Sequence, residues 1–336
     1  MHCPRKLYYI LHSGKNSKLA YYVSSYLHIR APRFILRACC RWDLRSWERR
    51  PDRDEIMQRV AYYNRLDTVA DIDRERFRRE SVALKDQPMT GQKVYYLDAY
   101  RYARCFPPSS RWCLLPGDIV HVPAVPSIVK SRPLVEDNAC SVLMKLDRVR
   151  HFLFVKDRKP FREKKNMVIF RGLIGQDGGT DLKRNRYLFV SRYFGHPLCD
   201  IGVIDTAYPK WHTEKLTIGE HLDYKFIMAL EGNDVASNLK WVMSSNSIAV
   251  MPRPTCETWF MEGLLKPNVH YIEIAPDFSD LEERIQHYID HPDEAEQIIH
   301  NAHAWVARFR DRKRERIISY LVLRKYFDIM REPGKR

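Results

Sequence analysis

The amino-acid sequence predicts an α/β protein whose second half is Rossmann-like. In that half, short apolar runs alternate with helix-compatible stretches, from MVIF (167–170) to HYIEI (270–274), which is typical of βαβ units around a largely parallel sheet. At 336 residues the chain is long enough for two domains of ordinary size. The charged segment VKDRKPFREKKN (155–166) is the best linker, so we expect an N-terminal domain at 1–160 and a C-terminal domain at 161–336.

The first half is predicted to begin with helices and to continue with strands and loops. Residues 1 to about 80 have mixed helical spacing, for example in RDEIMQRVAYYNRLDTVADIDRERF (53–77). The short runs KVYYLDAY (93–100), DIVHVPAV (118–125) and SIVKSRPL (127–134), separated by prolines, then favour strands. The segment ACSVLMKLDRVRHFLF (139–154) predicts a helix.

The second half is predicted to alternate strands with helices and to end in helices. The expected strands are MVIF, DIGVID (200–205), YKFIMALEG (224–232), SIAVM (247–251) and HYIEI. From Asp280 onward the spacing is helical, and Pro292 should divide the segment into two helices. The run RERIISYLVLRKYFDIM (314–330) predicts a last helix. A ligand cleft is expected between the two domains.

The composition indicates a globular protein with anionic partners. Lys and Arg number 57 against 42 Asp and Glu, a formal charge of +15, which favours nucleic acid, acidic membrane or phosphorylated substrates. The eight cysteines form no CxxC pair, which disfavours zinc ribbons and disulfide scaffolds. No segment approaches the roughly 18 apolar residues of a membrane span, so a cytoplasmic protein is expected. The arginine- and aromatic-rich stretch 26–50 could nevertheless rest on an acidic membrane.

A glycine-rich loop follows the first strand of the second half. Arg171 and Gly172 lead into Gly175, Gly178 and Gly179, and then into the basic run Lys183, Arg184 and Arg186. The spacing matches neither a Walker A loop nor GxGxxG. A guanidinium and close backbone approach suit a phosphate, although a plain flexible loop with solvated charges explains the pattern about as well.

A second loop follows the strand YKFIMALEG. The turn Gly232-Asn233-Asp234 precedes a helix predicted from about 235 to 244, with Asn233 or Asp234 as its N-cap. Free N–H groups at the helix start could hold a diphosphate. Because the Asp234 carboxylate would compete with an anion, it could instead bind a sugar or ribose hydroxyl.

Several segments, in this order, make the sequence resemble glycosyltransferase family 90. This family includes protein O-glucosyltransferases, fungal capsule-associated proteins and bacterial lipopolysaccharide glycosyltransferases, and the sequence is most similar to the bacterial branch. The resemblance covers about residues 90–310, through VPAVPSIVKSRPL, FRG with RNRYLFVSR, YKFIMALEGNDVASNLKWVMSSNSIAVM, ETWFMEGLLKPNVHYIEI and DLEERIQHYIDHPDEAEQIIHNAHAWV. It implies a GT-B architecture, two Rossmann-like domains facing across a cleft, and a UDP-sugar donor bound mainly by the second.

The resemblance also implies donor-binding residues. Arg171 matches the arginine at the donor diphosphate, Arg184 matches a second basic position, and Gly232 with the start of the next helix matches the donor-binding turn. The family's serine and arginine at that helix start fall on Ala236 and Asn238. Because Asn238 carries no charge, Arg171, Arg184, Lys225 or Lys240 would have to neutralise the diphosphate. Glu257 is a candidate for the donor's ribose or sugar.

The sequence departs from the family at the catalytic base. The family's Arg-Asp pair falls on Arg132 and Pro133, so the aspartate that should deprotonate the acceptor is missing. Asp137 is our choice for the base, with Glu136 and Asp118 left open. Asp71-Ile72-Asp73 resembles a metal-binding DxD, but its charged, helix-like surroundings disfavour that interpretation.

The combined prediction is an inverting glycosyltransferase. It would move a hexose from a UDP-sugar to a hydroxyl of a lipopolysaccharide core or related glycan, with no metal required, in the cytoplasm and with a peripheral position on the inner membrane face left open. Electrostatic stabilisation of the leaving diphosphate can come from arginines. Two alternatives remain open: a basic protein that binds nucleic acid or another polyanion, although no nucleic-acid module is recognised, and a non-catalytic glycan-binding relative.

Overall fold

The computed structural model describes residues 5–69, 71–175 and 181–331. These residues form two compact units. The sheet unit comprises residues 5–16, 150–255 and 262–308, and the helical unit comprises 17–149, 256–261 and 309–331 apart from residue 70. Gly178 and Gly179 of the glycine-rich loop, and the Lys183 side chain, lie outside the described part of the chain.

The sheet unit is built on a five-stranded parallel sheet, as the alternation of apolar runs predicts. The strand order is β11-β9-β8-β6-β7, and every neighbouring pair is parallel. All five expected strands are confirmed. Their apolar residues are largely buried, as expected for a parallel sheet covered on both faces. Their bounds are β6 (Lys165–Gly172), β7 (Cys199–Val203), β8 (Tyr224–Met228), β9 (Ile248–Met251) and β11 (Ile272–Glu273).

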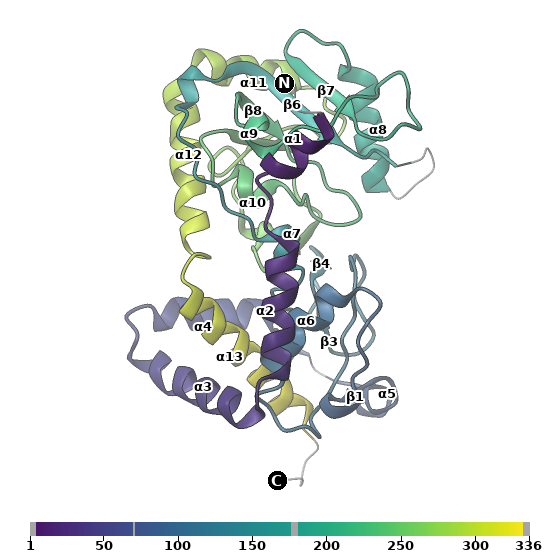
Figure 1. Cartoon of the computed structure of the whole chain (residues 1–336), viewed down its shortest axis with the longest axis vertical. Helices are drawn as coiled ribbons and strands as arrows, with labels where there is room; N and C mark the ends of the chain where they lie inside the picture. The colour runs from purple at the N-terminus through teal and green to yellow at the C-terminus, as the bar shows by residue number, and fades with distance from the viewer. Residues whose placement is uncertain (1–4, 70, 176–180, 332–336) are drawn as a thin grey trace. The chain divides into compact units, whose positions relative to one another are not determined.

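Three helices share one hydrophobic core with the sheet. They are α8 (Asp181–Tyr193), α11 (Leu281–Asp290) and α12 (Pro292–Ala307), seen around the strands in Figure 1. Phe189, Ile285 and Ile298 from these helices join Val168 and Phe226 from the strands in one buried cluster. Pro292 is the first residue of α12, so the predicted break is confirmed. The unit also contains α1 (Arg5–His12), α9 (Ile218–His221) and α10 (Leu239–Val242).

The helical unit consists of long helices with small two-stranded sheets. The predicted helices of the first 80 residues and the last helix are confirmed. The α-helices are α2 (Lys18–Arg30), α3 (Arg33–Ser46), α4 (Arg53–Tyr63), α5 (Arg74–Glu80), α6 (Lys93–Ala103) and α13 (Arg312–Met330). The strands pair as β1 (Val82–Ala83) with β2 (Arg111–Trp112), β3 (Ser127–Val129) with β5 (Ser141–Leu143), and β4 (Ser131–Pro133) with β10 (Cys256–Thr258).

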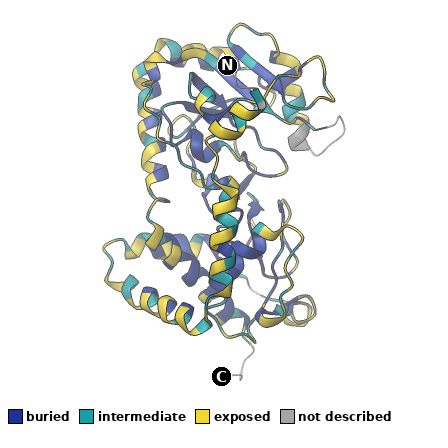
Figure 2. Ribbon diagram, viewed as in Figure 1, coloured by how far each residue is buried: buried dark blue, intermediate teal, exposed yellow. Residues whose placement is uncertain are grey.

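Short helical segments complete the described chain. They are α7 (Arg148–His151) and the 3-10 helices η1 (Trp47–Arg49), η2 (Leu66–Thr68), η3 (Leu84–Asp86), η4 (Phe161–Glu163) and η5 (Glu262–Leu264). Figure 2 shows the strands of the sheet unit as largely buried ribbon and α3 as largely exposed or intermediate ribbon.

Three predicted elements of the first half are wrong. The run KVYYLDAY forms helix α6, DIVHVPAV contains no strand, and ACSVLMKLDRVRHFLF forms only strand β5 and the short helix α7. In α6, Tyr95, Tyr96, Leu97, Asp98, Ala99 and Tyr100 are all buried, and Tyr96 stacks on Tyr100 with ring centroids 4.8 Å apart. A helix buried on so many sides lacks the polar face by which a helix is recognised in a sequence.

The division into units differs from a single boundary near residue 160. The start of the chain joins the sheet unit, because Arg5 pairs with Glu220 at 2.6 Å and the Ile218 amide donates to the Ser13 carbonyl at 3.2 Å. Helix α13 joins the helical unit, where it contacts α3, α4 and α6. Neither long-range association has a signal in local sequence.

Candidate active site

The carboxyl edge of the parallel sheet contains a topological switch point. From β6 the chain passes through α8 to β7 on one side, whereas β8, β9 and β11 lie on the other side of β6. The segments that leave β6 and β8 therefore diverge, and open parallel sheets bind ligands where neighbouring connections diverge in this way. The two loops singled out in the sequence are the ones that flank this point.

Arg186 of α8 joins the ends of both strands. Its guanidinium donates to the carbonyls of Leu230 at 2.7 Å, Glu231 at 2.8 Å and Leu173 at 3.0 Å. Burial lowers the pKa of Arg186 to about 10. A Cβ on Gly232 would lie only 2.9 Å from the Arg186 Nη2, so glycine leaves room for the guanidinium at this turn. Arg186 belongs to the basic run in the sequence but is not among the predicted site residues.

Arg171 lies at the end of β6 beside a carboxylate. Its Nη1 donates to the Asp200 carbonyl at 2.8 Å, and its Nη2 pairs with the Asp200 carboxylate, which also accepts from the Tyr224 hydroxyl. Burial raises the pKa of Asp200, but the hydrogen bonds from Tyr224 and Arg171 outweigh it, so the pKa lies below its ordinary value. Within the described residues, the buried Arg171 Nε has no hydrogen-bond partner.

Arg184 lies in the first turn of α8 and is exposed. In a βα unit the start of the helix lies at the carboxyl edge of the sheet. Arg184 is thus a predicted cation that the structure brings to this edge. Arg171 is the next-to-last residue of β6, but its guanidinium points back along the sheet to Asp200, which pairs in register with Ile169.

The turn after β8 differs from its prediction. The helix begins only after Asn238, as the four-residue α10, so an N-cap at Asn233 or Asp234 is wrong. The Asn238 amide instead donates to the Met228 carbonyl at 2.9 Å. Asn233 is exposed, whereas Asp234 and Ala236 are buried.

The two predicted lysines lie elsewhere in the sheet unit. Lys240 is fully buried and pairs with Glu262. Lys225 lies near the start of β8 with its ammonium 4.9 Å from the centre of the Phe161 ring, and burial lowers its pKa. Neither ammonium is presented at the carboxyl edge in this conformation.

The predicted catalytic arginine forms a buried pair in the helical unit. Arg132 of β4 and Glu257 of β10 are cross-strand partners, and Arg132 Nε donates to Glu257 Oε1 at 2.7 Å. Both side chains are 0% exposed, and the Tyr62 hydroxyl also donates to Glu257. The pair holds β4 to β10, so direct contact of either residue with a substrate would need a rearrangement.

The three candidates for the base have different surroundings. Glu136 and Asp137 are exposed in the loop between β4 and β5. Asp118 accepts from the Tyr95 hydroxyl at 3.1 Å and pairs with Lys130. Asp137 is thus accessible to an acceptor, and its role as base stays a prediction.

The comparisons with known proteins identify the family. Residues 154–333, more than half of the chain, match the family described as glycosyl transferase family 90. The chain belongs to this family. A relative from Dichelobacter nodosus, described as O-glucosyltransferase LpsA, is 38% identical over 318 residues, covering 93% of this chain and 96% of the relative. Uncharacterized protein 179R of Invertebrate iridescent virus 6 is 31% identical over 125 residues, 35% of this chain and 10% of its own length.

The family match confirms the resemblance and identifies the chain as a glycosyltransferase. The matched region contains the carboxyl edge with Arg171, Arg184 and Arg186, whereas Arg132 and Asp137 precede it. Across the described ranges no group of three or more His, Cys, Asp or Glu side chains is placed to hold a metal ion. None of the helices seen in residues 5–331 is long and apolar enough to cross a membrane.

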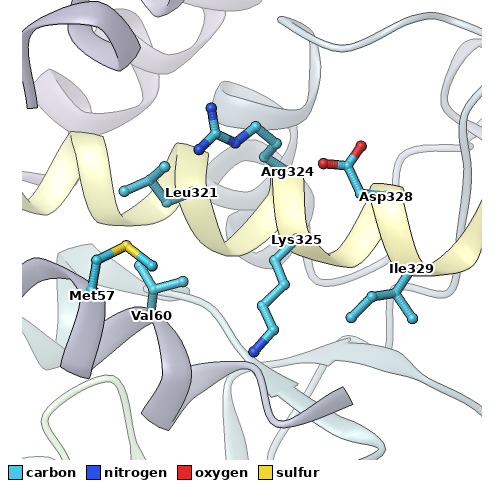
Figure 3. A pocket seen from close by; sticks show the side chains of 7 residues that line it. All are labelled: Met57, Val60, Leu321, Arg324, Lys325, Asp328 and Ile329. Carbon is cyan, nitrogen blue, oxygen red and sulfur yellow. The ribbon is translucent and has the colours of Figure 1, made fainter. Parts of the chain in front are cut away.

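One hollow of the helical unit contains no predicted site residue. It lies between α4 and α13, has a volume of about 430 Å³, and is drawn in Figure 3. Its lining is Met57, Val60, Leu321, Arg324, Lys325, Asp328 and Ile329. The Lys325 ammonium pairs with Asp67 at 2.7 Å and Asp328 with Arg331 at 3.1 Å, so we assign no chemistry to this hollow.

Proposed function

We propose that this family 90 glycosyltransferase moves a hexose from a UDP-sugar to a hydroxyl of a lipopolysaccharide core or related glycan. The observation that carries the proposal is the switch point at the carboxyl edge, where Arg186 holds the ends of β6 and β8 together. The name of the Dichelobacter relative, an O-glucosyltransferase, supports glucose as the first sugar to test. The proposed architecture is GT-B, with the sheet unit as the donor-binding domain.

In this proposal the donor diphosphate lies at the carboxyl edge. Arg184 contributes an exposed guanidinium, and Arg171 turns from Asp200 toward the phosphate oxygens, where its fork can bind two of them. Arg186 keeps its three backbone carbonyls and is a positioning residue for the turn at Gly232. The guanidinium charges stabilise the leaving diphosphate, so we expect no metal requirement.

The proposed displacement is inverting. A base takes the proton of the acceptor hydroxyl as the new glycosidic bond forms at the anomeric carbon and the bond to the diphosphate breaks. We propose the Asp137 carboxylate for this step, because it is exposed in the loop between β4 and β5. The proposed location is the cytoplasm, at the inner face of the membrane.

The test compares two arginines of the same helix. Arg184→Ala removes a charge from the first turn of α8, whereas Arg192→Ala removes one from its last turn, where Arg192 donates to the Asp277 carbonyl at 3.0 Å. Transfer from UDP-glucose to lipopolysaccharide core is measured in the presence of a chelator. We expect Arg184→Ala to raise the KM for the donor roughly tenfold, the scale of one charge-assisted hydrogen bond, and Arg192→Ala to leave it unchanged.

Each other outcome of this test has a definite meaning. Equal effects of the two substitutions would show that the diphosphate does not bind at the start of α8. Loss of all turnover in chelator, restored by a divalent cation, would overturn the metal-independent mechanism. Binding of UDP without turnover on any acceptor would favour the non-catalytic relative.

A further inference from the structure

Helix α3 exposes apolar and basic side chains on one face. Phe34 is 72% exposed, Ile35 45% and Trp42 72%. Two arginines of the same helix, Arg41 and Arg45, are exposed too. With 100° per residue, these five positions fall within about 120° of the helix circumference. We name this set, with Ala38 at its centre, the outer face of α3.

The opposite side of α3 is buried. Leu36, Cys40 and Asp43 are the buried residues of the helix, and α3 contacts α13. Asp43 is the sole acidic residue of α3, and it pairs with Arg316 of α13, with Nη2 and Oδ1 3.0 Å apart. Its charge is therefore neutralised inside the unit, and the outer face presents cations without a compensating carboxylate.

Helix α2 has the same distribution on a smaller scale. Leu19, Val23 and Leu27 recur every four residues and are 76%, 51% and 67% exposed. The helix contains no acidic residue, and Lys18 and Arg30 lie at its two ends. From 18 to 46 the chain thus combines exposed apolar side chains with positive charge and a single, buried acid.

We propose that the outer face of α3 docks on an anionic phospholipid bilayer. Arginines at the helix surface attract acidic headgroups, while Phe34, Ile35 and Trp42 enter the interface between headgroups and acyl chains, as in interfacial amphipathic helices. Tryptophan favours that interface because its ring is apolar and its N–H is polar. The inference deepens the proposed function, since it places the transferase on the surface where a lipid-anchored acceptor would lie.

The exposed apolar side chains distinguish a bilayer from a soluble polyanion. Binding to a polyanion by arginines alone weakens steeply with salt, whereas apolar insertion persists once the charges are screened. A second copy of the chain is a poorer occupant, because the like charges of Arg41 and Arg45 would face each other across a symmetric contact.

The test is sedimentation with vesicles of phosphatidylcholine, alone or mixed with phosphatidylglycerol. We expect the protein to sediment with the mixed vesicles and not with phosphatidylcholine alone. Arg41→Gln with Arg45→Gln should lower the partition coefficient roughly 25-fold, at about fivefold for each arginine near the surface. Phe34→Ser with Trp42→Ser should lower it about tenfold or more, and should remove the part that resists salt.

The control is Met89→Ser with Val120→Ser, two side chains that are 43% exposed in the same unit but outside α2 and α3. This control should sediment like the unchanged protein. Equal loss in the control, unaltered sedimentation of both α3 variants, or binding to RNA that survives the two serine substitutions would overturn the proposal. Turnover of UDP-glucose on a delipidated, soluble acceptor is measured in parallel, because its absence would contradict the proposed function without bearing on docking.

Discussion

The two units each contain an arginine–carboxylate pair, and the two pairs differ in burial. In the helical unit, the side chains of Arg132 and Glu257 are both 0% exposed. In the sheet unit, the Arg171 side chain is 10% exposed and that of Asp200 is 30% exposed. In a fully buried pair, neither charge can leave its partner without a large desolvation cost. In a partly exposed pair, the arginine can exchange its carboxylate for a ligand. We call Arg171 and Asp200 the rim pair.

The hydrogen-bond partners of the two guanidinium groups support the same distinction. Arg132 also donates to the carbonyls of Tyr62 at 2.9 Å and Ser141 at 3.3 Å, so its hydrogen-bonding capacity is used within the unit. The Arg171 Nε is buried with no partner in the described structure. The comparison favours a structural role for Arg132 and leaves Arg171 with capacity for a phosphate oxygen.

The largest expected effect comes from breaking the buried pair. Arg132→Met should lower the free energy of unfolding by about 3–5 kcal/mol, because the buried Glu257 carboxylate would lose the guanidinium that pairs with it. Urea denaturation followed by tryptophan fluorescence measures the change, and Trp259, buried and stacked on Tyr63 with centroids 3.9 Å apart, contributes to the signal.

The matched variant replaces both partners. Arg132→Met with Glu257→Leu should recover most of the lost stability, since an apolar pair of similar volume removes the desolvation cost of both charges. If the Arg132→Met variant is as stable as the unchanged protein but inactive, Arg132 has a catalytic role instead of a structural one.

The sheet could be predicted from the sequence because its signals are local. Each strand is a short apolar run bounded by turn residues, and Pro292 divides α11 from α12 by its own geometry. Helix α6 could not be predicted, because Tyr95, Tyr96 and Tyr100 are typical strand residues that are buried here against other helices. The assignment of α13 to the helical unit rests on packing between residues hundreds of positions apart.

The candidate site was predictable where a residue lies at a strand end or, like Arg184, at the start of the helix that follows the strand. Arg171 follows the apolar run of β6, and Gly232 follows that of β8. Asp200 and Tyr224 come from two other strands, so the contacts of Asp200 with Arg171 and with Tyr224 depend on the strand order. Arg186 could have been found from the close approach that Gly232 allows, but only once α8 is placed over the edge.

The next largest effect is expected on UDP binding by the rim pair. Arg171→Ala should weaken UDP binding by about tenfold or more, because it removes charge-assisted hydrogen bonds worth about 1.5–3 kcal/mol. Asp200→Asn should strengthen UDP binding a few-fold, since the amide no longer competes with the diphosphate for the guanidinium. Calorimetric titration measures both dissociation constants.

The control for this pair is Arg284→Ala on α11, which removes an arginine 3.4 Å from its own carboxylate partner Asp280. It should leave UDP affinity unchanged. Weaker binding by both Arg171→Ala and Asp200→Asn would mean that Asp200 orients Arg171 for the ligand instead of competing with it.

The smallest expected effect is the pH dependence of the rim pair. Because hydrogen bonds from Tyr224 and Arg171 keep the pKa of folded Asp200 below its ordinary value, the ionised carboxylate stabilises the folded state above about pH 4, the pKa of an unfolded aspartate. That contribution is lost as the pH falls through the lower, folded-state pKa. Since the carboxylate is 30% exposed, we expect it to be about 1 kcal/mol or less.

Urea denaturation between about pH 5 and pH 3 tests this expectation. The difference in unfolding free energy between the unchanged protein and Asp200→Asn should shrink as the pH falls, because the protonated aspartate resembles the amide. Glu283→Gln on α11 makes the same change of charge at an exposed position and should show no such convergence. A difference that stays constant down to pH 3 would show that Arg171 and Asp200 do not interact in solution, and the competition between Asp200 and a donor phosphate would lose its basis.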